Sequence, residues 1–192
     1  LDFGVATEFN YKEIAASLED QFSVLDGLVH CAGILGPRTP IEFYSADDWE
    51  LTMRINVSAA FLLTKYLLPF LKKSMDGRVL FTSSSVGRKA RGHWGAYAVS
   101  KFALEGLMQV LADELDNTSK IRINSLNPGG IRTSMRRTAY PAENPSANPP
   151  PEVLMPLYLY LFSSESRNIN GQALNFKDFN PSIYSRPAQS DE

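Results

Sequence analysis

The sequence predicts an α/β fold, and three observations lead to that prediction. Short apolar runs that are typical of buried strands alternate along the chain with longer segments of helical period. Polar loops follow the strands, as at residues 83–87. The 192 residues, 44% of them hydrophobic and 21% charged, have the composition of one globular domain. Because open α/β sheets bind ligands at the carboxyl ends of their strands, we expect the functional site at these loops.

The first half of the chain contains two predicted helices and two predicted strands. Apolar residues at i, i+4 spacing predict an amphipathic helix over 11–22, and a strand follows over 25–30. Ser45 is a suitable N-cap, and the segment 49–72 is long enough for a bent or two-part helix. The apolar run 78–82 predicts a second buried strand.

The second half repeats this alternation. The clearest helix is predicted over 96–115, and a third strand over 121–126 ends at an Asn-Pro-Gly-Gly sequence. Three consecutive prolines suit the start of a helix over 152–163, since proline is tolerated in the first turn. A last short strand is predicted over 171–176.

Two segments depart from this pattern. Residues 132–151 are rich in proline, asparagine, serine and alanine, which predicts a mobile substrate loop or lid. Residues 177–192 are polar and are expected to form an exposed tail. We therefore expect residues 1–176 to make up one folded unit.

Charge and composition argue against several classes of function. A net charge of -2 gives no basic field for nucleic acid, and the apolar stretches 61–71 and 154–162 are too short to span a membrane. Cys31 is the only cysteine and no secretory leader is seen, which favours the cytoplasm. His30 and His93 lack further ligands at metal-binding spacing, so no metal site is expected.

The most informative cluster is Trp-Gly-Ala-Tyr-Ala-Val-Ser-Lys, in which Tyr97 and Lys101 lie four residues apart on one face of a helix. An ammonium beside a phenol favours the phenolate, so Lys101 is expected to lower the pKa of Tyr97 toward the range of an acid/base catalyst. The pair alone also fits a half-buried tyrosine beside a solvated lysine.

The surrounding residues favour the catalytic alternative. Ser84 lies thirteen positions before Tyr97 in the loop after a strand, and Asn56 lies on the long helix. Pro128-Gly129 ends the next strand and Thr133 follows. In this order and spacing the sequence resembles the short-chain dehydrogenase/reductase family from about residue 2 to 176.

The resemblance implies a Rossmann-like, doubly wound parallel sheet and a reaction. It implies an NAD(P)-dependent oxidoreductase that interconverts a small-molecule carbonyl and an alcohol by hydride transfer. By the same resemblance Tyr97 is the acid/base, Lys101 lowers the tyrosine pKa and holds the nicotinamide ribose, Ser84 positions the substrate carbonyl, and Asn56 helps to hold a proton-relay water.

The resemblance also implies cofactor contacts. Cys31-Ala32-Gly33 is similar to the family's Asn-Ala-Gly turn, with cysteine in place of asparagine. Cys31 itself is expected to be a small buried residue and not a reactive thiol. The residues expected to contact NAD(P), in addition to Tyr97 and Lys101, are Asp2, Ala32, Gly33, Pro128, Gly129, Ile131 and Thr133.

One family feature is missing. The glycine-rich dinucleotide fingerprint between the first strand and helix is not found, and the chain begins at Leu1 without methionine. We therefore expect the chain to lack the family's first β-α-β-α part and to form the C-terminal two-thirds of the domain. The alternative to an enzyme is a non-catalytic fragment or interaction module that cannot bind cofactor.

Further expectations concern the surroundings of the site. Arg88, Lys89 and Arg91 are interpreted as a solvated basic loop, with recognition of an acidic carrier or a phosphate as the alternative. The aromatic and sulfur-containing side chains near the site either border the substrate or pack in the core: Trp94, Met135 and Tyr140. The sequence resembles bacterial oxoacyl-carrier-protein reductases, and helices 56–72 and 96–115 have apolar surface for a homodimer or homotetramer.

Overall fold

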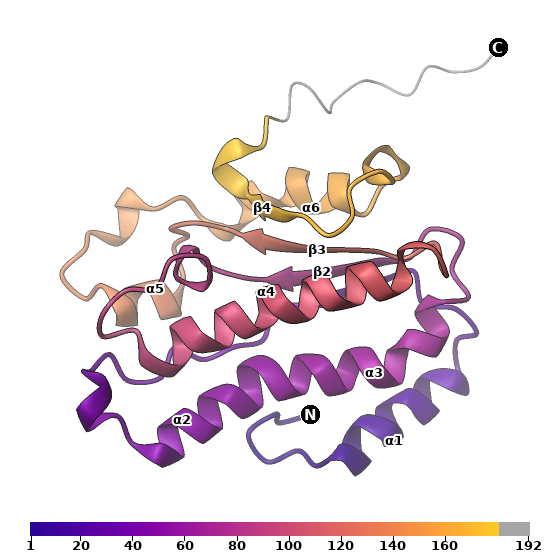
Figure 1. Cartoon of the computed structure of the whole chain (residues 1–192). Coiled ribbons are helices and arrows are strands. Elements are labelled where there is room, and N and C mark those ends of the chain that lie inside the picture. The colour runs from indigo at the N-terminus through magenta and orange to yellow at the C-terminus, as the bar shows by residue number, and fades with distance from the viewer. Residues whose placement is uncertain (181–192) are drawn as a thin grey trace.

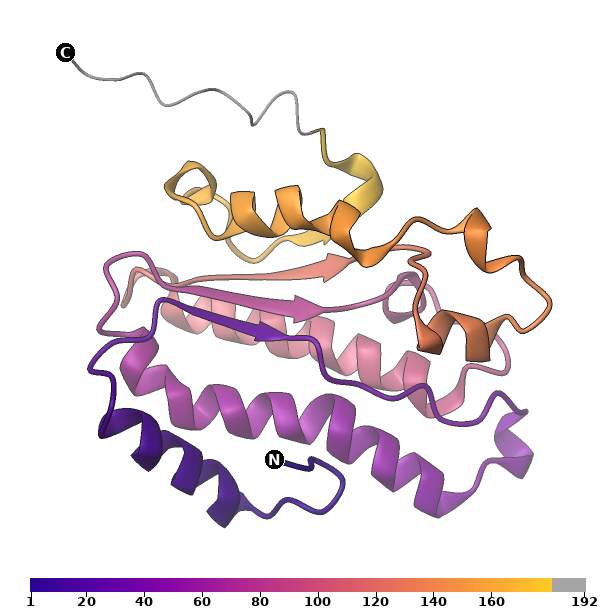
Figure 2. The ribbon, with the colours of Figure 1, turned by 180° about the vertical axis from the view of Figure 1, so that it is seen from behind.

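The computed structural model describes residues 1–180, which form a four-stranded parallel sheet with helices on both faces (Figure 1). The strands lie in the order β1-β2-β3-β4, and Figure 2 shows β1 at one edge. Their bounds are Gly27–His30 (β1), Arg78–Thr82 (β2), Arg122–Asn127 (β3) and Ala173–Asn175 (β4). The predicted α/β fold is confirmed, although β1 and β4 are shorter than expected.

The alternation of side chains along β2 explains why both faces are covered. Val79 and Phe81 point to one face, where they pack with residues of α3 (Ala59–Leu71) and α4 (Gly95–Asp116). Leu80 points to the other face and packs with α6 (Met155–Leu161). Since a parallel strand buried on both faces must be apolar throughout, the run Val-Leu-Phe was readable from the sequence.

The long helix predicted over 49–72 is in two parts. Helix α2 (Ala46–Met53) begins at the N-cap Ser45, whose side chain accepts a hydrogen bond from the Asp48 N–H. One π-helical segment, Arg54–Ser58, then joins α2 to α3. A π-helical turn inserts an extra residue into a helix and is often found at functional sites. Asn56 lies inside this turn.

Capping shifts helix α1 (Glu8–Glu19) toward the N-terminus relative to the predicted range 11–22. The Asn10 side-chain oxygen accepts a hydrogen bond from the Thr7 N–H at 3.0 Å, and Thr7 has the extended conformation of an N-cap. The helix therefore begins one turn earlier than its apolar pattern indicates.

The segment predicted as a loop over 132–151 contains regular structure. Thr133 caps helix α5 (Ser134–Ala139) by accepting a hydrogen bond from Arg136 N–H, and a 3₁₀ turn follows at Pro145–Ala147. In Figure 1 this segment lies beyond the carboxyl ends of the strands. The helix predicted over 152–163 begins as a 3₁₀ turn, Pro151–Leu154, and continues as α6.

The expected tail begins with packed residues. Lys177 lies in a 3₁₀ turn, and the half-buried Phe179 contacts Tyr160 with ring centroids 5.9 Å apart. The rest of the expected tail, residues 181–192, lies outside the described residues. In the described part of the chain, every helix is too short or too polar to cross a membrane.

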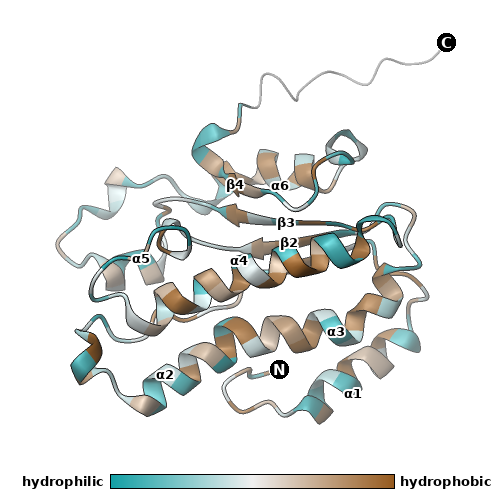
Figure 3. Ribbon diagram, viewed as in Figure 1, coloured by the Kyte–Doolittle hydropathy of each residue, from teal (hydrophilic) through white to brown (hydrophobic). Residues whose placement is uncertain are grey.

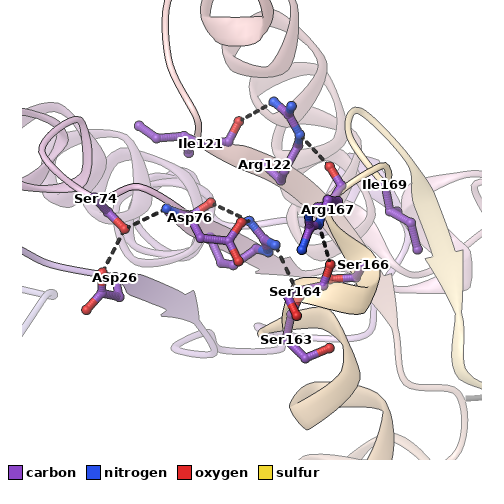
Figure 4. Close-up of polar contacts among 12 residues, drawn as sticks. Asp26, Ser74, Asp76, Ile121, Arg122, Ser163, Ser164, Ser166, Arg167 and Ile169 are labelled. Carbon is purple, nitrogen blue, oxygen red and sulfur yellow. Dashed lines mark hydrogen bonds and ion pairs between the residues drawn. The ribbon is translucent and has the colours of Figure 1, made fainter. Parts of the chain in front are cut away.

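A polar network holds the amino ends of the strands (Figure 4). The Arg78 guanidinium is buried, lies 2.7 Å from the Asp76 carboxylate and donates to the Ser163 carbonyl at 3.1 Å. Arg122 donates to the Arg167 carbonyl at 2.7 Å. These bonds tie the segment after α6 to β2 and β3 at the end of the sheet away from the predicted site.

The environment of His30, the last residue of β1, leads us to predict a loss of stability in acid. Its ring stacks on Phe81 at 4.7 Å and hydrogen-bonds Thr64 at 2.8 Å, and burial lowers its pKa to about 4. The unfolded chain therefore binds a proton below about pH 6.5 that the folded chain takes up only near pH 4. We expect the free energy of unfolding to fall by up to about 3 kcal/mol over that range.

Urea unfolding at stepped pH values measures this effect. His30→Gln should flatten the pH dependence, whereas substitution of the exposed His93 by asparagine should preserve it. Equal slopes for wild type and His30→Gln would contradict the assignment.

Candidate active site

A pocket of about 330 Å³ lies at the carboxyl ends of the strands, where the sequence predicted it. It is built from the turn after β1, the end of β2 with its loop, the start of α4, the segment after β3, and α5. The lining residues are Cys31, Gly33, Leu35, Thr82, Ser83, Ser84, Trp94, Tyr97, Lys101, Asn127, Pro128, Gly129, Ile131, Thr133, Met135, Arg136, Ala139 and Tyr140. Three of the four predicted catalytic residues therefore share one cavity.

The Ser84 hydroxyl lies close enough to the Tyr97 hydroxyl to lower the tyrosine pKa. Ser84 has an extended backbone and caps the short turn Ser85–Gly87, so its side chain is held at the end of β2. Tyr97 lies in the first turn of α4 and is 7% exposed. Two hydroxyl groups from different elements thus meet at the pocket.

The effect expected of Lys101 on Tyr97 is not seen in this structure. Burial raises the pKa of Tyr97, and the hydrogen bond with Ser84 offsets only part of that rise. The Lys101 ammonium lies 5.5 Å from the centre of the tyrosine ring and donates to the Thr82 carbonyl at 2.7 Å. The ammonium is held by β2, and the phenol keeps its proton.

The pKa of Lys101 is also shifted, which leads to a second prediction about how stability depends on pH. Burial lowers its pKa to about 8, while the nearby Cys31 and Glu105 oppose the change. Between pH 8 and 10.5 the unfolded chain binds more protons than the folded one, so this residue makes stability rise with pH. We expect the free energy of unfolding to gain about 2 kcal/mol between pH 7 and pH 10 from this residue.

This gain is measured as the difference between wild type and Lys101→Met in urea unfolding. The exposed Lys120, replaced by methionine in the same way, should show no such pH-dependent difference. A difference between wild type and Lys101→Met that stays constant from pH 7 to pH 10 would show that the lysine titrates normally.

Asn56 lies behind the pocket wall and not in it. Its amide donates to the Ile34 carbonyl at 2.9 Å and accepts from the Ile34 N–H at 2.8 Å. It also donates to the Ser100 hydroxyl at 2.9 Å. A Cβ atom on Gly33 would lie 3.3 Å from the Asn56 oxygen and 3.7 Å from the Lys101 amine. Asn56 therefore fixes the Gly33-Ile34 backbone against α4.

Most of the residues predicted to hold a cofactor line the pocket, with two exceptions. Gly33, Pro128, Gly129, Ile131 and Thr133 are among the lining residues. Asp2 lies outside, exposed, with its carboxylate accepting from the Gly4 N–H at 2.8 Å. Ala32 is exposed and is not a lining residue, although both its neighbours are.

The expectation that Cys31 is buried is wrong. Its side chain is exposed and lines the pocket, with the thiol sulfur 3.2 Å from the Thr82 hydroxyl and 3.9 Å from the Tyr158 hydroxyl. The residue follows the last residue of edge strand β1, so the chain has already left the packed sheet at this point.

The interpretation of Arg88 as part of a solvated loop is also wrong. Its guanidinium bonds the Glu105 carboxylate at 3.0 Å, the Asn175 side chain at 2.7 Å and the Leu174 carbonyl at 2.9 Å. Glu105, which is 6% exposed, also accepts from the Ser125 hydroxyl at 2.6 Å. Lys89 and Arg91 are exposed as expected. Arg88 therefore joins the Ser84 loop to α4, β3 and β4.

Aromatic side chains form one wall of the pocket. Trp94 lies between Tyr97 and Tyr140, with ring centroids 5.9 and 6.0 Å away. The Arg38 guanidinium lies 4.6 Å from the Trp94 ring, and that of Arg136 lies 3.9 Å from the Tyr140 ring. Trp94, Met135 and Tyr140 line the pocket and also pack in one cluster of apolar side chains, so the structure is compatible with both alternatives.

Sequence reasoning missed several residues at the site. Ser83 is 2% exposed and lines the pocket, and its hydroxyl lacks a hydrogen-bond partner within the described chain. Arg38 and Arg136 lie on segments without a recognisable motif. The serine lies within the polar loop already identified. Arg38 gave no signal, since its contacts include Trp94, 56 positions away, and the Ala139 carbonyl, 101 positions away. Among residues 1–180, no cluster of three or more His, Cys, Asp or Glu could hold a metal ion.

Comparison with known proteins identifies the family. The sequence model of a protein family described as short chain dehydrogenase matches residues 1–144. The uncharacterized oxidoreductase YciK of Escherichia coli K12 is 46% identical over 91% of this chain and 69% of its own length.

Solved structures agree. A short chain dehydrogenase from Pseudomonas syringae is 57% identical with a TM-score of 0.89, over 91% of this chain and 71% of that one. One from Shigella flexneri 2a, complexed with NADP, is 46% identical with a TM-score of 0.88, over 91% of this chain and 72% of that one. The chain belongs to the short chain dehydrogenase family of oxidoreductases.

Proposed function

We propose that this protein is an NAD(P)-dependent oxidoreductase that interconverts a carbonyl and an alcohol, with Tyr97 as acid/base. The observation that carries the proposal is the meeting of the Tyr97 and Ser84 hydroxyls in a pocket that also contains Lys101. The relative from Shigella flexneri that is complexed with NADP supports the choice of cofactor.

The residues around the pocket fit such a cofactor. The buried Ser83 hydroxyl has no partner in the described chain and lines the cavity, so it is available to a ligand. Gly129 has a φ of 75°, and a Cβ there would meet nothing within 4 Å, which leaves open space beside the backbone. We assign Lys101, Gly33, Ile131 and Thr133 to hold NAD(P), which supplies the hydride when bound.

Each catalytic side chain then has a task that its position supports. Ser84 donates a hydrogen bond to the carbonyl oxygen of the substrate, and Tyr97 gives its proton to that oxygen as negative charge develops there. Burial keeps the phenol protonated, as an acid requires. Lys101 places a positive charge near the ring and stabilises the phenolate left behind. Asn56 holds the Gly33-Ile34 backbone and positions Lys101 indirectly through Ser100 on α4.

The function is tested by incubating the whole protein with NADPH or NADH and a panel of aldehydes and ketones, with absorbance followed at 340 nm. Substrate-dependent oxidation of either cofactor is expected. A protein that neither binds nor oxidises NADPH and NADH would favour the non-catalytic alternative.

The same family membership leads us to propose a homodimer or homotetramer. Figure 3 shows that α3 is largely apolar. Its outward residue Phe61 is 47% exposed, and Val99, Phe102 and Val110 of α4 are 42%, 43% and 54% exposed. Apolar surface of this kind, on two neighbouring helices, is typical of interfaces between subunits. Light scattering of the wild type and of Phe102→Glu should show a larger mass for the wild type.

A further inference from the structure

A second pocket, of about 280 Å³, adjoins the proposed active site. It lies between α5 and the 3₁₀ turn at Pro145–Ala147. Thr133, Arg136 and Tyr140 line both pockets, so the two cavities share one wall. A ligand that reacts at Tyr97 therefore has a neighbouring space into which it can extend.

The second pocket is rich in positive charge. Three arginines line it, Arg132, Arg136 and Arg137, against one carboxylate, that of Glu143. The Glu143 carboxylate accepts two hydrogen bonds of 2.6 Å from Arg136 and one of 2.8 Å from Asn148. The guanidinium groups of Arg132 and Arg137 have no side-chain partner among residues 1–180 and are exposed.

This charge contrasts with its surroundings. The protein as a whole carries a net charge of -2, and the wall of the first pocket is formed largely by aromatic and apolar side chains. Arg136 lies at the boundary, with its guanidinium against the Tyr140 ring. Two uncompensated guanidinium groups beside an apolar cavity fit a molecule with an apolar body and an anionic end, because guanidinium binds carboxylate and phosphate oxygens through paired hydrogen bonds.

Building on the proposed function, we infer that the substrate is an anionic carbonyl compound. Its apolar part lies against Trp94 and Tyr140, and its carboxylate or phosphate binds Arg132 and Arg137. A cofactor also carries phosphate groups that could bind the same arginines, so the test follows substrate and cofactor separately.

The test compares two ketones that differ only in charge, 4-acetylbenzoate and its methyl ester. Wild-type protein with NADPH should show a kcat/KM about tenfold higher for the anion at low salt, the value of one charge-assisted hydrogen bond. In the double variant Arg132→Gln/Arg137→Gln this preference should disappear while the KM for NADPH stays unchanged. High salt should also reduce the preference in the wild type.

A matched control removes two positive charges elsewhere. Lys72 and Lys120 are exposed and lie near the amino ends of the strands, so Lys72→Gln/Lys120→Gln should keep the wild-type preference. Equal kcat/KM for the two ketones in the wild type would overturn the inference. A raised KM for NADPH in the arginine double variant, with the preference intact, would assign the arginines to the cofactor and overturn it as well.

Binding separates a failure of this inference from a failure of the proposed function. Trp94 lines the pocket, so its fluorescence should change when a ketone binds. If no compound of the carbonyl panel, these two ketones included, is reduced, the proposed function fails, but tighter binding of the anion that is lost in Arg132→Gln/Arg137→Gln still supports the anion site. Equal binding of both ketones would overturn it.

Discussion

Replacement of Tyr97 by phenylalanine is expected to lower kcat for carbonyl reduction by about 10³-fold, the usual contribution of a positioned general acid. The substitution removes one oxygen and keeps the ring, which packs against Trp94 in a cluster of buried side chains. The melting temperature should therefore change little. Oxidation of NADPH at 340 nm measures the loss.

A second tyrosine provides the matched control. Tyr66 lies on α3, with its hydroxyl bonded to Glu8 far along the chain, and it is not among the pocket residues. Tyr66→Phe should retain full activity. Activity in Tyr97→Phe within threefold of the wild type would remove the acid/base role on which the proposed function depends.

Replacement of Arg88 by methionine is expected to lower the free energy of unfolding by about 3–5 kcal/mol, because it leaves a buried carboxylate without its partner. The Glu105 side chain is 8% exposed and keeps only the Ser125 hydroxyl as a hydrogen-bond donor. The loss should exceed that of an exposed pair such as Lys65 with Glu8, where Lys65→Met should cost about 1 kcal/mol or less. Urea unfolding measures both.

The double variant Arg88→Met/Glu105→Met tests the cause. With both charges removed, much of the lost stability should return, since apolar side chains of similar size can replace a buried ion pair. The 3.0 Å contact indicates that Arg88 and Glu105 interact. If the stability loss of the double variant equals the sum of the two single losses, this interaction is absent.

Sequence-based predictions were accurate where the structure depends on residues close together in the chain. The bounds of β2 were predicted correctly, because a strand buried on both faces contains a continuous apolar run, here Val79 to Phe81. The predicted range of α4, 96–115, is close to the observed one for a similar reason, since the apolar period of the helix is set by the sheet that it covers. Ser84, Tyr97 and Lys101 were identified by their order and spacing together with the resemblance to the family, and the structure brings them to one pocket.

Predictions that depend on distant contacts were less successful. Arg88 looked like a solvated residue because its partners, Glu105 and Asn175, are 17 and 87 positions away. The direction of the Tyr97 pKa shift required knowledge of burial, which outweighs the hydrogen bond with Ser84. The structure in 132–151 was missed because a short helix with a threonine cap gives little periodic signal.

The π-helical segment Arg54–Ser58 has a consequence for how the chain can vary in length. Such a turn holds one residue more than an α-helix needs, and deletion of that residue would allow α2 and α3 to merge into one regular helix. Because the wide turn absorbs the extra residue, the deletion would leave α2 and α3 with nearly the same rotation about the helix axis. Asn56 lies within the turn that would be rebuilt, so we expect the deletion to cost its two hydrogen bonds with Ile34 while the helices on either side keep their packing.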